Sequence, residues 1–532
     1  MLLSIPKVKL ILQNLFYLMD IRVIIKPIAK VEELMKELLM EEFQVKEEIA
    51  QELFKNQIKK HFDNLKDSCY LVAETNYVDK VYRNSYYHYY SSKLNKTKRE
   101  CVRISIFDGI VKKEEDFQNK DKVEVLKKCY RGFIILRPTI PYVIGRSTLS
   151  PLVLNENKFL CCTAPLQTTV NNIKMSVIGF PHSSQDTETM TCAETTLWAI
   201  MEYFGTKYPE YRPTLPFRII ETLNNISFER QIPSQGLHIS QMSFVLKEFG
   251  FGTRIYSLEH DENFENHLSC YVESGIPIII DIDNRHKVGT SVPEREREKE
   301  IGHANICIGH EKISNGHISG LPICIETILI GEKEKKIEFF DWDDIKKEFI
   351  FIDDNCPTYQ KARLDEPTKH YPKEWRNCKI HSFVVPLYTK VYLGVDVAKS
   401  YIKLFLATYN VIKNGETLIR FYLTSSRSFK DSLSLNPSFH KKIKEIILEK
   451  MMPKFIYVAE LSNKELMKNS PREAEGLIIL DATEANIEND KPLIIGLYGD
   501  RYFKYDLANG CLKENQLHYI CNQFTIYENN LI

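Results

Sequence analysis

The stretch QDTETMTCAETTLWAIMEYFG, from Gln185 to Gly205, is the most informative part of this sequence. Its apolar residues recur at helical spacing, and Gly205 is the expected end of the helix that they predict. Thr189 and Thr191 precede the helix as candidate N-caps, so Cys192 is expected in the first turn. The apolar residues that share one face are Ala193, Leu197, Ile200, Met201 and Phe204.

A cysteine in the first turn of a helix can act as a nucleophile. Unpaired backbone N–H groups and the positive end of the helix dipole both favour the thiolate, which is the reactive form. The ordinary alternative for a lone cysteine at this position is a small buried residue. The catalytic hypothesis for Cys192 therefore depends on partners elsewhere in the chain.

Two downstream segments provide a candidate base. The run SGIPIIIDID, from Ser274 to Asp283, is typical of a buried strand that follows a helix ending at Gly275. The run GHANICIGH, from Gly302 to His310, predicts a second strand in which apolar and polar residues alternate and His303 leads the polar set. A histidine at the mouth of a strand can serve as the general base for a cysteine.

A third run, FIFIDDN from Phe349 to Asn355, predicts a strand that ends in paired carboxylates. Either Asp353 or Asp354 can fix the tautomer of a catalytic imidazole, as a triad requires. Adjacent residues on a strand point to opposite faces, and the pattern leaves open which of the two meets His303.

The order of these elements resembles the papain-like fold. It is most similar to the bacterial cysteine peptidases that resemble the leader-cleaving domains of bacteriocin exporters. Family members often end the third strand in Asn-Asp-Pro, which aligns with Asp353-Asp354-Asn355 and favours Asp354, with Asp353 as the rival. The resemblance implies a nucleophile at Cys192, a general base at His303, an orienting carboxylate at Asp354 or Asp353, and an oxyanion-hole amide at Gln185.

The sequence departs from the family pattern near the cysteine. Gln185 lies about one residue farther from the cysteine than the family usually places this glutamine, so a surface polar residue is the alternative. Glu194 brings a negative charge that would oppose thiolate formation. An acidic residue in a first turn is also ordinary capping chemistry, and that structural role is favoured. His310 is a second histidine of the same run and is expected at a turn.

The expected fold class is α+β, with a papain-like cysteine peptidase domain at residues 176–390. It is flanked by an N-terminal mixed α/β region at 1–175 and a C-terminal α+β region at 391–532. The N-terminal region predicts a strand near IRVIIKPI, a helical stretch from Val31 to Leu65 and β-type runs from Arg131 to Pro181. The C-terminal region has no motif that can be assigned to a reaction.

The segment from Tyr82 to Arg99 interleaves tyrosines with basic residues. Such a combination can stack on and neutralise a single-stranded nucleic acid. The alternative is a strand of tyrosines followed by a charged turn. Because the chain has 71 basic and 71 acidic residues and no net charge, the second interpretation is favoured and a nucleic-acid partner is not expected.

The thirteen cysteines are scattered, with no CxxC pair and no repeated spacing. A disulfide framework and a zinc cluster are both poor explanations, so a reducing cytoplasm is the expected compartment and no cofactor is expected. The apolar stretch from Leu10 to Met19 loosely imitates a signal sequence but contains Gln13 and Asn14 and has no small-residue cleavage site. Met19 is a candidate natural start, and no membrane association is expected.

The sequence therefore predicts a cysteine peptidase that cuts peptide or isopeptide bonds in a peptide or protein substrate. One alternative is acyl transfer to an amine, as in transglutaminase-like enzymes on the same fold. Another is a catalytically inactive module that only binds protein. The charged insertion from Asn284 to Ile301, directly before His303, is a candidate substrate lid or an ordinary solvated loop.

Overall fold

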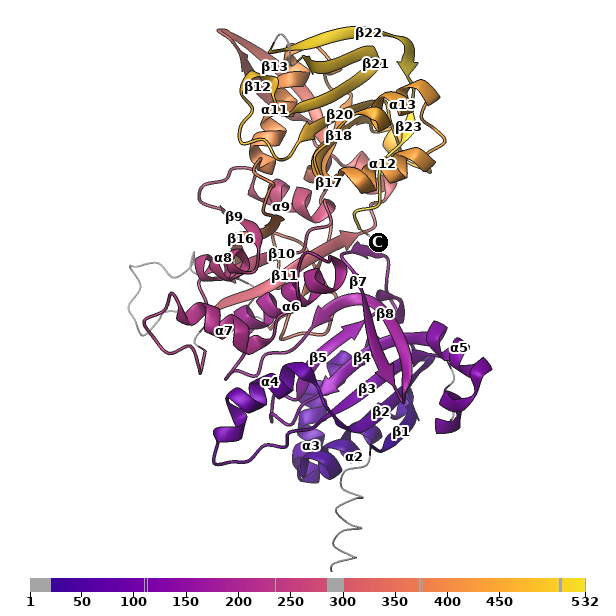
Figure 1. The fold of residues 1–532 in the computed structure, drawn as a ribbon, viewed down its shortest axis with the longest axis vertical. Helices are drawn as coiled ribbons and strands as arrows, with labels where there is room; N and C mark the ends of the chain where they lie inside the picture. The colour runs from indigo at the N-terminus through magenta and orange to yellow at the C-terminus, as the bar shows by residue number, and fades with distance from the viewer. Residues whose placement is uncertain are drawn as a thin grey trace, which may run out of the picture. The chain divides into compact units, whose positions relative to one another are not determined.

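The computed structural model of the protein divides into two compact units (Figure 1). It describes residues 21–109, 111, 113–234, 236–284, 301–372, 375, 377–506 and 510–531. Unit 1 comprises Met1–Asn157, Thr163–Val245 and Ile352–Gln360, and unit 2 comprises Lys158–Cys162, Leu246–Phe351 and Lys361–Ile532. Both units combine helices with mainly antiparallel sheets, which confirms the α+β class. The predicted signal-like stretch and residues 285–300 of the predicted lid lie outside the described residues.

Unit 1 is built on a seven-stranded antiparallel sheet with the order β1-β2-β3-β4-β5-β8-β7. The predicted first strand and the predicted β-type runs after Arg131 are confirmed by β1, β4, β5, β7 and β8. Buried aromatic and aliphatic side chains of the sheet pack together with Phe117 and Leu126. The strands are β1 (Val23–Pro27), β2 (Cys69–Tyr77), β3 (Cys101–Asp108), β4 (Tyr130–Leu136), β5 (Ile144–Leu149), β7 (Ala164–Val170) and β8 (Ile173–His182).

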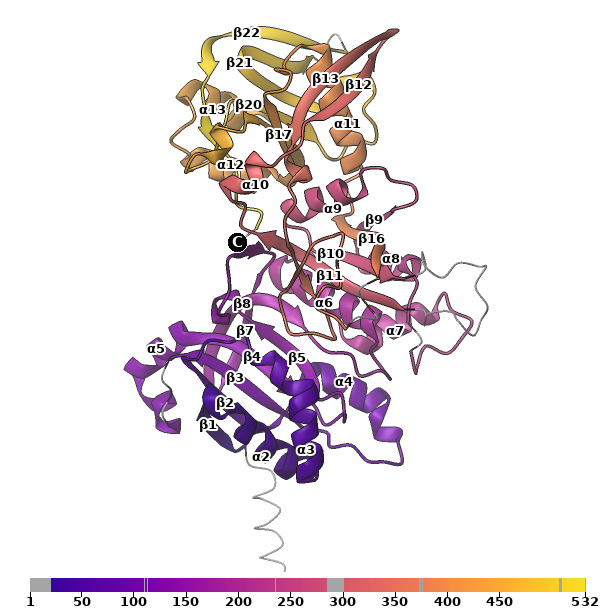
Figure 2. The same cartoon turned by 180° about the vertical axis from the view of Figure 1, so that it is seen from behind.

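Several helices of unit 1 pack on this sheet (Figure 2). The predicted helical stretch from Val31 to Leu65 is largely helical, but it is divided because Gln44 adopts a left-handed backbone with a φ of 56° and ends the first helix. The helices are α2 (Val31–Phe43), α3 (Glu47–Leu53), α4 (Lys80–His88), α5 (Lys120–Cys129), α6 (Cys192–Lys207), α7 (Pro216–Asn224) and α8 (Ile239–Glu248), whose last turn falls in unit 2. Of these, α6 packs against β7 and β8.

The tyrosine-rich segment forms the helix α4 and not the strand considered above. The Asp79 side chain caps the helix by accepting hydrogen bonds from the backbone N–H groups of Val81 and Tyr82. Four of the five lysine and arginine side chains between Tyr82 and Arg99 form ion pairs with glutamates. These pairs neutralise the positive charge that would be needed to bind a phosphate backbone. These pairs are Arg83–Glu100, Lys93–Glu188, Lys98–Glu42 and Arg99–Glu100.

The first sheet of unit 2 contains the three strands predicted around the candidate base and carboxylates. Its order is β15-β14-β11-β10-β16-β9, with β6 paired to β11. The helix α9 (Phe264–Glu273) ends before Gly275, which has a φ of 73°, as predicted. The strands are β6 (Phe159–Cys161), β9 (Phe251–Ser257), β10 (Ile278–Asp283), β11 (Gly302–Glu311), β14 (Phe349–Ile352), β15 (Gln360–Ala362) and β16 (Lys379–Tyr388).

His310 lies inside β11, so its predicted place at a turn is wrong. It pairs with Leu160 of β6 and is 2% exposed. Both faces of β11 are buried from His303 to His310, and the alternation of polar and apolar residues therefore does not separate a solvent face from a core face. The polar residues of β11 are buried because neighbouring elements cover both sides of its sheet.

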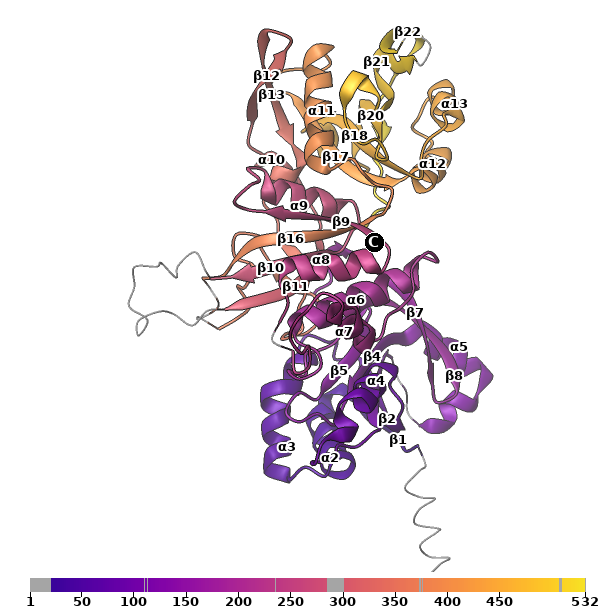
Figure 3. The ribbon, with the colours of Figure 1, turned by 60° about the vertical axis from the view of Figure 1, so that its left-hand side comes forward.

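The second sheet of unit 2 has the order β12-β13-β17-β18-β20-β21-β22. Phe421 and Leu423 of β17 pack towards α11, whereas Leu418 and Tyr422 pack towards α12 and α13, so helices cover both faces (Figure 3). The elements are α10 (Asn315–Ser319), β12 (Cys324–Ile330), β13 (Lys333–Asp341), α11 (Val395–Thr408), β17 (Thr417–Ser425), α12 (Ser426–Leu435), α13 (Lys441–Glu449), β18 (Phe455–Asn463), β19 (Glu473–Ala474), β20 (Gly476–Asp481), β21 (Leu493–Asp506), β22 (Cys511–Cys521) and β23 (Phe524–Thr525).

Within the described ranges, no helix is both long enough and apolar enough to cross a bilayer.

Candidate active site

Cys192 is the first residue of α6, with Thr191 as the N-cap, as predicted. The cysteine is half-buried. Glu194 turns back to accept a hydrogen bond from the Thr191 backbone N–H at 3.1 Å, and its other oxygen accepts one from the Ser234 hydroxyl at 2.5 Å. The predicted capping role of Glu194 is thus confirmed. Its carboxylate is engaged by the N-cap and by Ser234 in the same unit.

The predicted end of this helix at Gly205 is wrong, because α6 continues to Lys207. Gly205 is needed for a different reason. A Cβ atom at this position would lie 2.2 Å from the backbone nitrogen of Pro213. The glycine therefore permits a close approach between the helix and the following chain, and it does not act as a left-handed stop.

The loop before Cys192 is organised by Asp186. One oxygen of this buried carboxylate accepts hydrogen bonds from the backbone N–H groups of Glu188, Thr189 and Met190, at 3.0, 2.7 and 2.9 Å. The Arg137 guanidinium donates to the carbonyl oxygen of Gln185 at 2.6 Å and also to that of Ser184. These contacts fix the backbone between Gln185 and the start of α6.

A turn from Asp353 to Cys356 carries the two predicted carboxylates. The Cys356 N–H donates to the Asp353 carbonyl at 3.2 Å, and the Asn355 N–H donates to the Asp353 side chain at 3.0 Å. The side-chain amide of Gln185 donates to the Asn355 side-chain oxygen at 2.7 Å. Unit 1 therefore brings the predicted oxyanion-hole glutamine into contact with the turn that contains Asp353 and Asp354, both of which are buried.

His303 belongs to unit 2, where it is the second residue of β11 and pairs in register with Ile282 of β10. The ring is 4% exposed. Its Nε2 atom lies 3.3 Å from the Tyr371 hydroxyl, and the ring meets Trp375 edge-on at a centroid distance of 5.4 Å. Tyr371 and Trp375 stack on each other at 4.4 Å. This aromatic pair restricts the orientation of the imidazole within unit 2.

The five predicted site residues are thus divided between the units. Gln185, Cys192, Asp353 and Asp354 belong to unit 1, and His303 belongs to unit 2. Several residues around them had not been singled out from the sequence. Asp186 could have been found from the Asp-Thr-Glu-Thr pattern, which is typical of a side chain that caps its own loop. No local sequence pattern pointed to the other residues that contact the candidate site or its loops. These are Lys60, Arg137, His182, Asn355, Tyr371 and Trp375.

No family model matches the chain, and no curated protein has a similar sequence.

Most of the other cysteines are poor nucleophile candidates. All thirteen are free thiols and eight are buried. Burial raises the pKa of the Cys69 thiol to about 11 and that of the Cys521 thiol to about 12, which disfavours the reactive thiolate. Cys511, by contrast, is exposed. Cys511 is a useful internal reference for thiol reactivity.

His182, at the end of β8, is buried and contacts the carboxylate turn. Its Nε2 atom lies 3.1 Å from the Asp353 carbonyl oxygen and 3.1 Å from the Cys356 carbonyl oxygen. Burial lowers the pKa of His182 from 6.5 to about 4, although these two acceptors and the Asp353 charge partly oppose the shift. The other charged or titratable groups that act on its ring are Lys60 and His61.

His182→Gln is expected to weaken the acid destabilisation of the protein. Because the folded pKa is lower than the unfolded one, the unfolded chain binds the proton first, and stability falls as the pH drops from 6.5 to about 4. A shift of this size corresponds to about 3 kcal/mol. Glutamine can donate from the same position but does not titrate. Urea unfolding near neutral pH and at about pH 4 should show a smaller loss for the variant, and equal losses would contradict the assignment.

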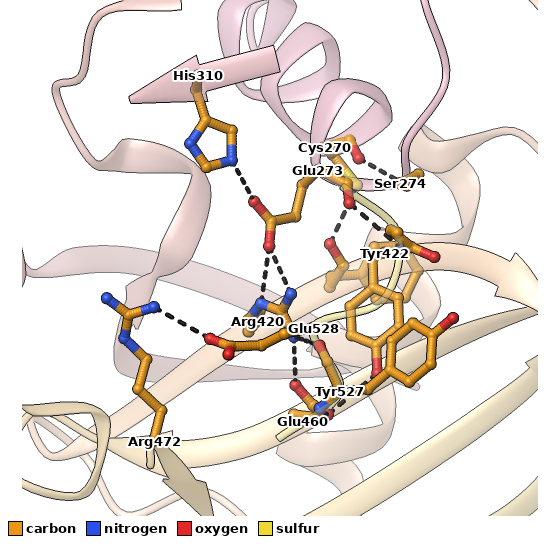
Figure 4. A network of polar contacts seen from close by, with 12 residues as sticks. Cys270, Glu273, Ser274, His310, Arg420, Tyr422, Glu460, Arg472, Tyr527 and Glu528 are labelled. Carbon is orange, nitrogen blue, oxygen red and sulfur yellow. Dashed lines mark hydrogen bonds and ion pairs between the residues drawn. The ribbon is translucent and has the colours of Figure 1, made fainter. Parts of the chain in front are cut away.

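A buried ionic network lies at the opposite end of β11 from His303 (Figure 4). Arg420 of β17 donates through Nε and Nη2 to Glu273 of α9, at 2.9 and 2.5 Å, and through Nη1 to Glu460 of β18 at 2.7 Å. Nε2 of His310 lies 3.0 Å from the other oxygen of Glu273. Tyr527 completes the network, since its backbone N–H donates to Glu460 and its carbonyl accepts from Arg420. The network therefore joins β11 and α9 to the second sheet of unit 2.

Arg420 forms ion pairs with both buried carboxylates of this network. Burial alone would raise the pKa of Glu273, but the Arg420 guanidinium and the His310 ring hold it well below its usual value. Glu273, His310, Arg420 and Glu460 are each at least nine-tenths buried. A cavity of about 300 Å³ adjoins the network and is also lined by Trp342, Arg472 and Glu528. All the polar atoms of Glu273 are engaged by protein partners, which indicates a structural role for the cluster.

Proposed function

We propose that the protein is a cysteine peptidase with a papain-like catalytic domain. The observation that carries the proposal is the arrangement in unit 1: a half-buried cysteine opens a capped helix, and the glutamine of the preceding loop contacts the turn that contains two buried carboxylates. The chemistry of these groups matches that of a thiol nucleophile, an oxyanion donor and an orienting acid.

In the proposed reaction, His303 accepts the proton of the Cys192 thiol, and the thiolate attacks the carbonyl carbon of a peptide or isopeptide bond. The side-chain amide of Gln185 has two N–H groups, and one of them donates to Asn355. The other donates to the developing oxyanion. The imidazolium returns the proton to the departing amine. Water, deprotonated by His303, then hydrolyses the thioester and releases Cys192.

Asp354 is the proposed orienting carboxylate, with Asp353 as the alternative. Asp353 already accepts a hydrogen bond from the Asn355 N–H within its own turn, which is a structural task. Comparing Asp353→Asn with Asp354→Asn separates the two, because the orienting residue should show the larger loss in kcat at equal thermal stability.

The test uses the full chain and an unbiased peptide library, with products identified by mass spectrometry. Wild type and Cys129→Ala, which removes another half-buried thiol of unit 1, should cleave the same peptides, and Cys192→Ala should cleave none. Iodoacetamide should alkylate Cys192 at least about tenfold faster than the exposed Cys511 near neutral pH. Ordinary reactivity of Cys192 together with no cleavage would reject the proposal. Incorporation of an added amine in place of water would instead indicate acyl transfer.

A further inference from the structure

The turn from Asp353 to Cys356 is held by side chains that are far from it in the sequence but belong to the same unit. His182 at the end of β8 contacts the first and the last carbonyl groups of the turn. Lys60 donates from its ammonium group to the carbonyl of Asn355 at 2.6 Å. Together these side chains contact three carbonyl groups of the turn, one at each end and one between them. The contacts therefore span the whole turn.

The protonation of His182 follows from its partners. Both groups near Nε2 are carbonyl oxygens, which only accept hydrogen bonds, so Nε2 carries the proton and donates to both. The ring is 1% exposed, and its Nδ1 atom has no hydrogen-bond partner. Because the site is buried, water cannot readily replace the Nε2–H donor. Loss of His182 would leave two buried carbonyl groups without this hydrogen bond, which is unfavourable.

We infer that His182 is a positioning residue for the proposed peptidase, because it clamps both ends of the turn that presents Asp353 and Asp354. This inference rests on the proposed function. His182 acts through the turn and needs no contact with substrate. Lys60 supports the same turn from its middle carbonyl. Through His182, the N-terminal sheet thereby supports the proposed catalytic carboxylates.

A pair of substitutions at His182 tests the clamp. The amide nitrogen of glutamine occupies the position of Nε2 and can donate to two carbonyls, whereas the amide of asparagine is too short to reach them. In His182→Asn, hydrogen exchange of the Asn355 and Cys356 amides should accelerate by about tenfold or more, and His182→Gln should remain near wild type. For peptide cleavage, kcat should fall in His182→Asn with little change in KM, and His182→Gln should restore it.

A second pair of variants tests the same turn without changing a buried side chain. Lys60→Met removes the donor to Asn355. Lys59→Met is the matched control, because Lys59 pairs with the exposed Asp63 at 2.9 Å. Lys60→Met should shift exchange and kcat in the direction of His182→Asn, and Lys59→Met should change neither. Unchanged exchange in folded His182→Asn would overturn the clamp. Faster exchange with unchanged kcat would show that the turn does not position a catalytic group.

The two proposals can fail separately. If the wild-type protein cleaves no peptide and Cys192 has ordinary reactivity, the peptidase assignment fails. The exchange measurement does not depend on activity, and it still decides whether His182 and Lys60 hold the turn.

Discussion

Replacing Arg420 by methionine is expected to lower the free energy of unfolding by about 3 to 5 kcal/mol, because it leaves buried carboxylates without their cation. Arg420 bonds to Glu273 and Glu460, and all three side chains are at least nine-tenths buried. His310 and Lys347 would remain as possible counter-charges for Glu273. The change in the midpoint of urea unfolding, monitored for unit 2 by hydrogen exchange, measures the loss.

Arg472→Met is the matched control, because Arg472 pairs with the exposed Glu528 at 3.1 Å beside the same cavity. A surface pair of this kind contributes about 1 kcal/mol or less. The Arg420→Met loss should also shrink towards acid pH, since burial without Arg420 raises the pKa of Glu273 and protonation then relieves the unpaired charge. Similar losses in the two variants would show that the buried network contributes little to stability.

Replacing His303 by asparagine is expected to lower kcat/KM for peptide cleavage by about four orders of magnitude or more if the proposed triad is correct. The substitution removes the general base while Cys192 and Gln185 remain. Alkylation of Cys192 should also become slower near neutral pH, because the proposed acceptor of the thiol proton is removed. Steady-state kinetics and the pH dependence of iodoacetamide labelling measure the two effects.

His440→Asn is the control for loss of an imidazole, since His440 caps α13 through a bond from the Lys442 N–H and asparagine is also a good cap. Its kcat/KM should equal that of wild type. Wild-type cleavage by His303→Asn would exclude His303 as the base and leave the roles of Cys192 and the carboxylate turn to be reassigned.

Local patterns in the sequence predicted several elements of the fold correctly. The correct predictions all depend on residues within a few positions of one another. They are the start of α6 at Cys192, the capping role of Glu194, the end of α9 before Gly275 and the strand before Asp353. Periodicity, capping preferences and the conformational freedom of glycine act over this range. The same reasoning gave the wrong end for α6, because Gly205 is required by the distant Pro213.

Only the tertiary structure identified the long-range contacts that support the candidate site. Lys60, His182 and Gln185 meet the turn at Asp353–Cys356 across more than 160 residues of sequence, as the separations of 295, 171 and 170 positions show. His310, expected at a turn, is instead buried beside Glu273 because β6 pairs with the end of β11. Such contacts leave no periodic signal in the chain. They depend on which strands become neighbours, and this is decided when the sheets form and the hydrophobic faces are buried together.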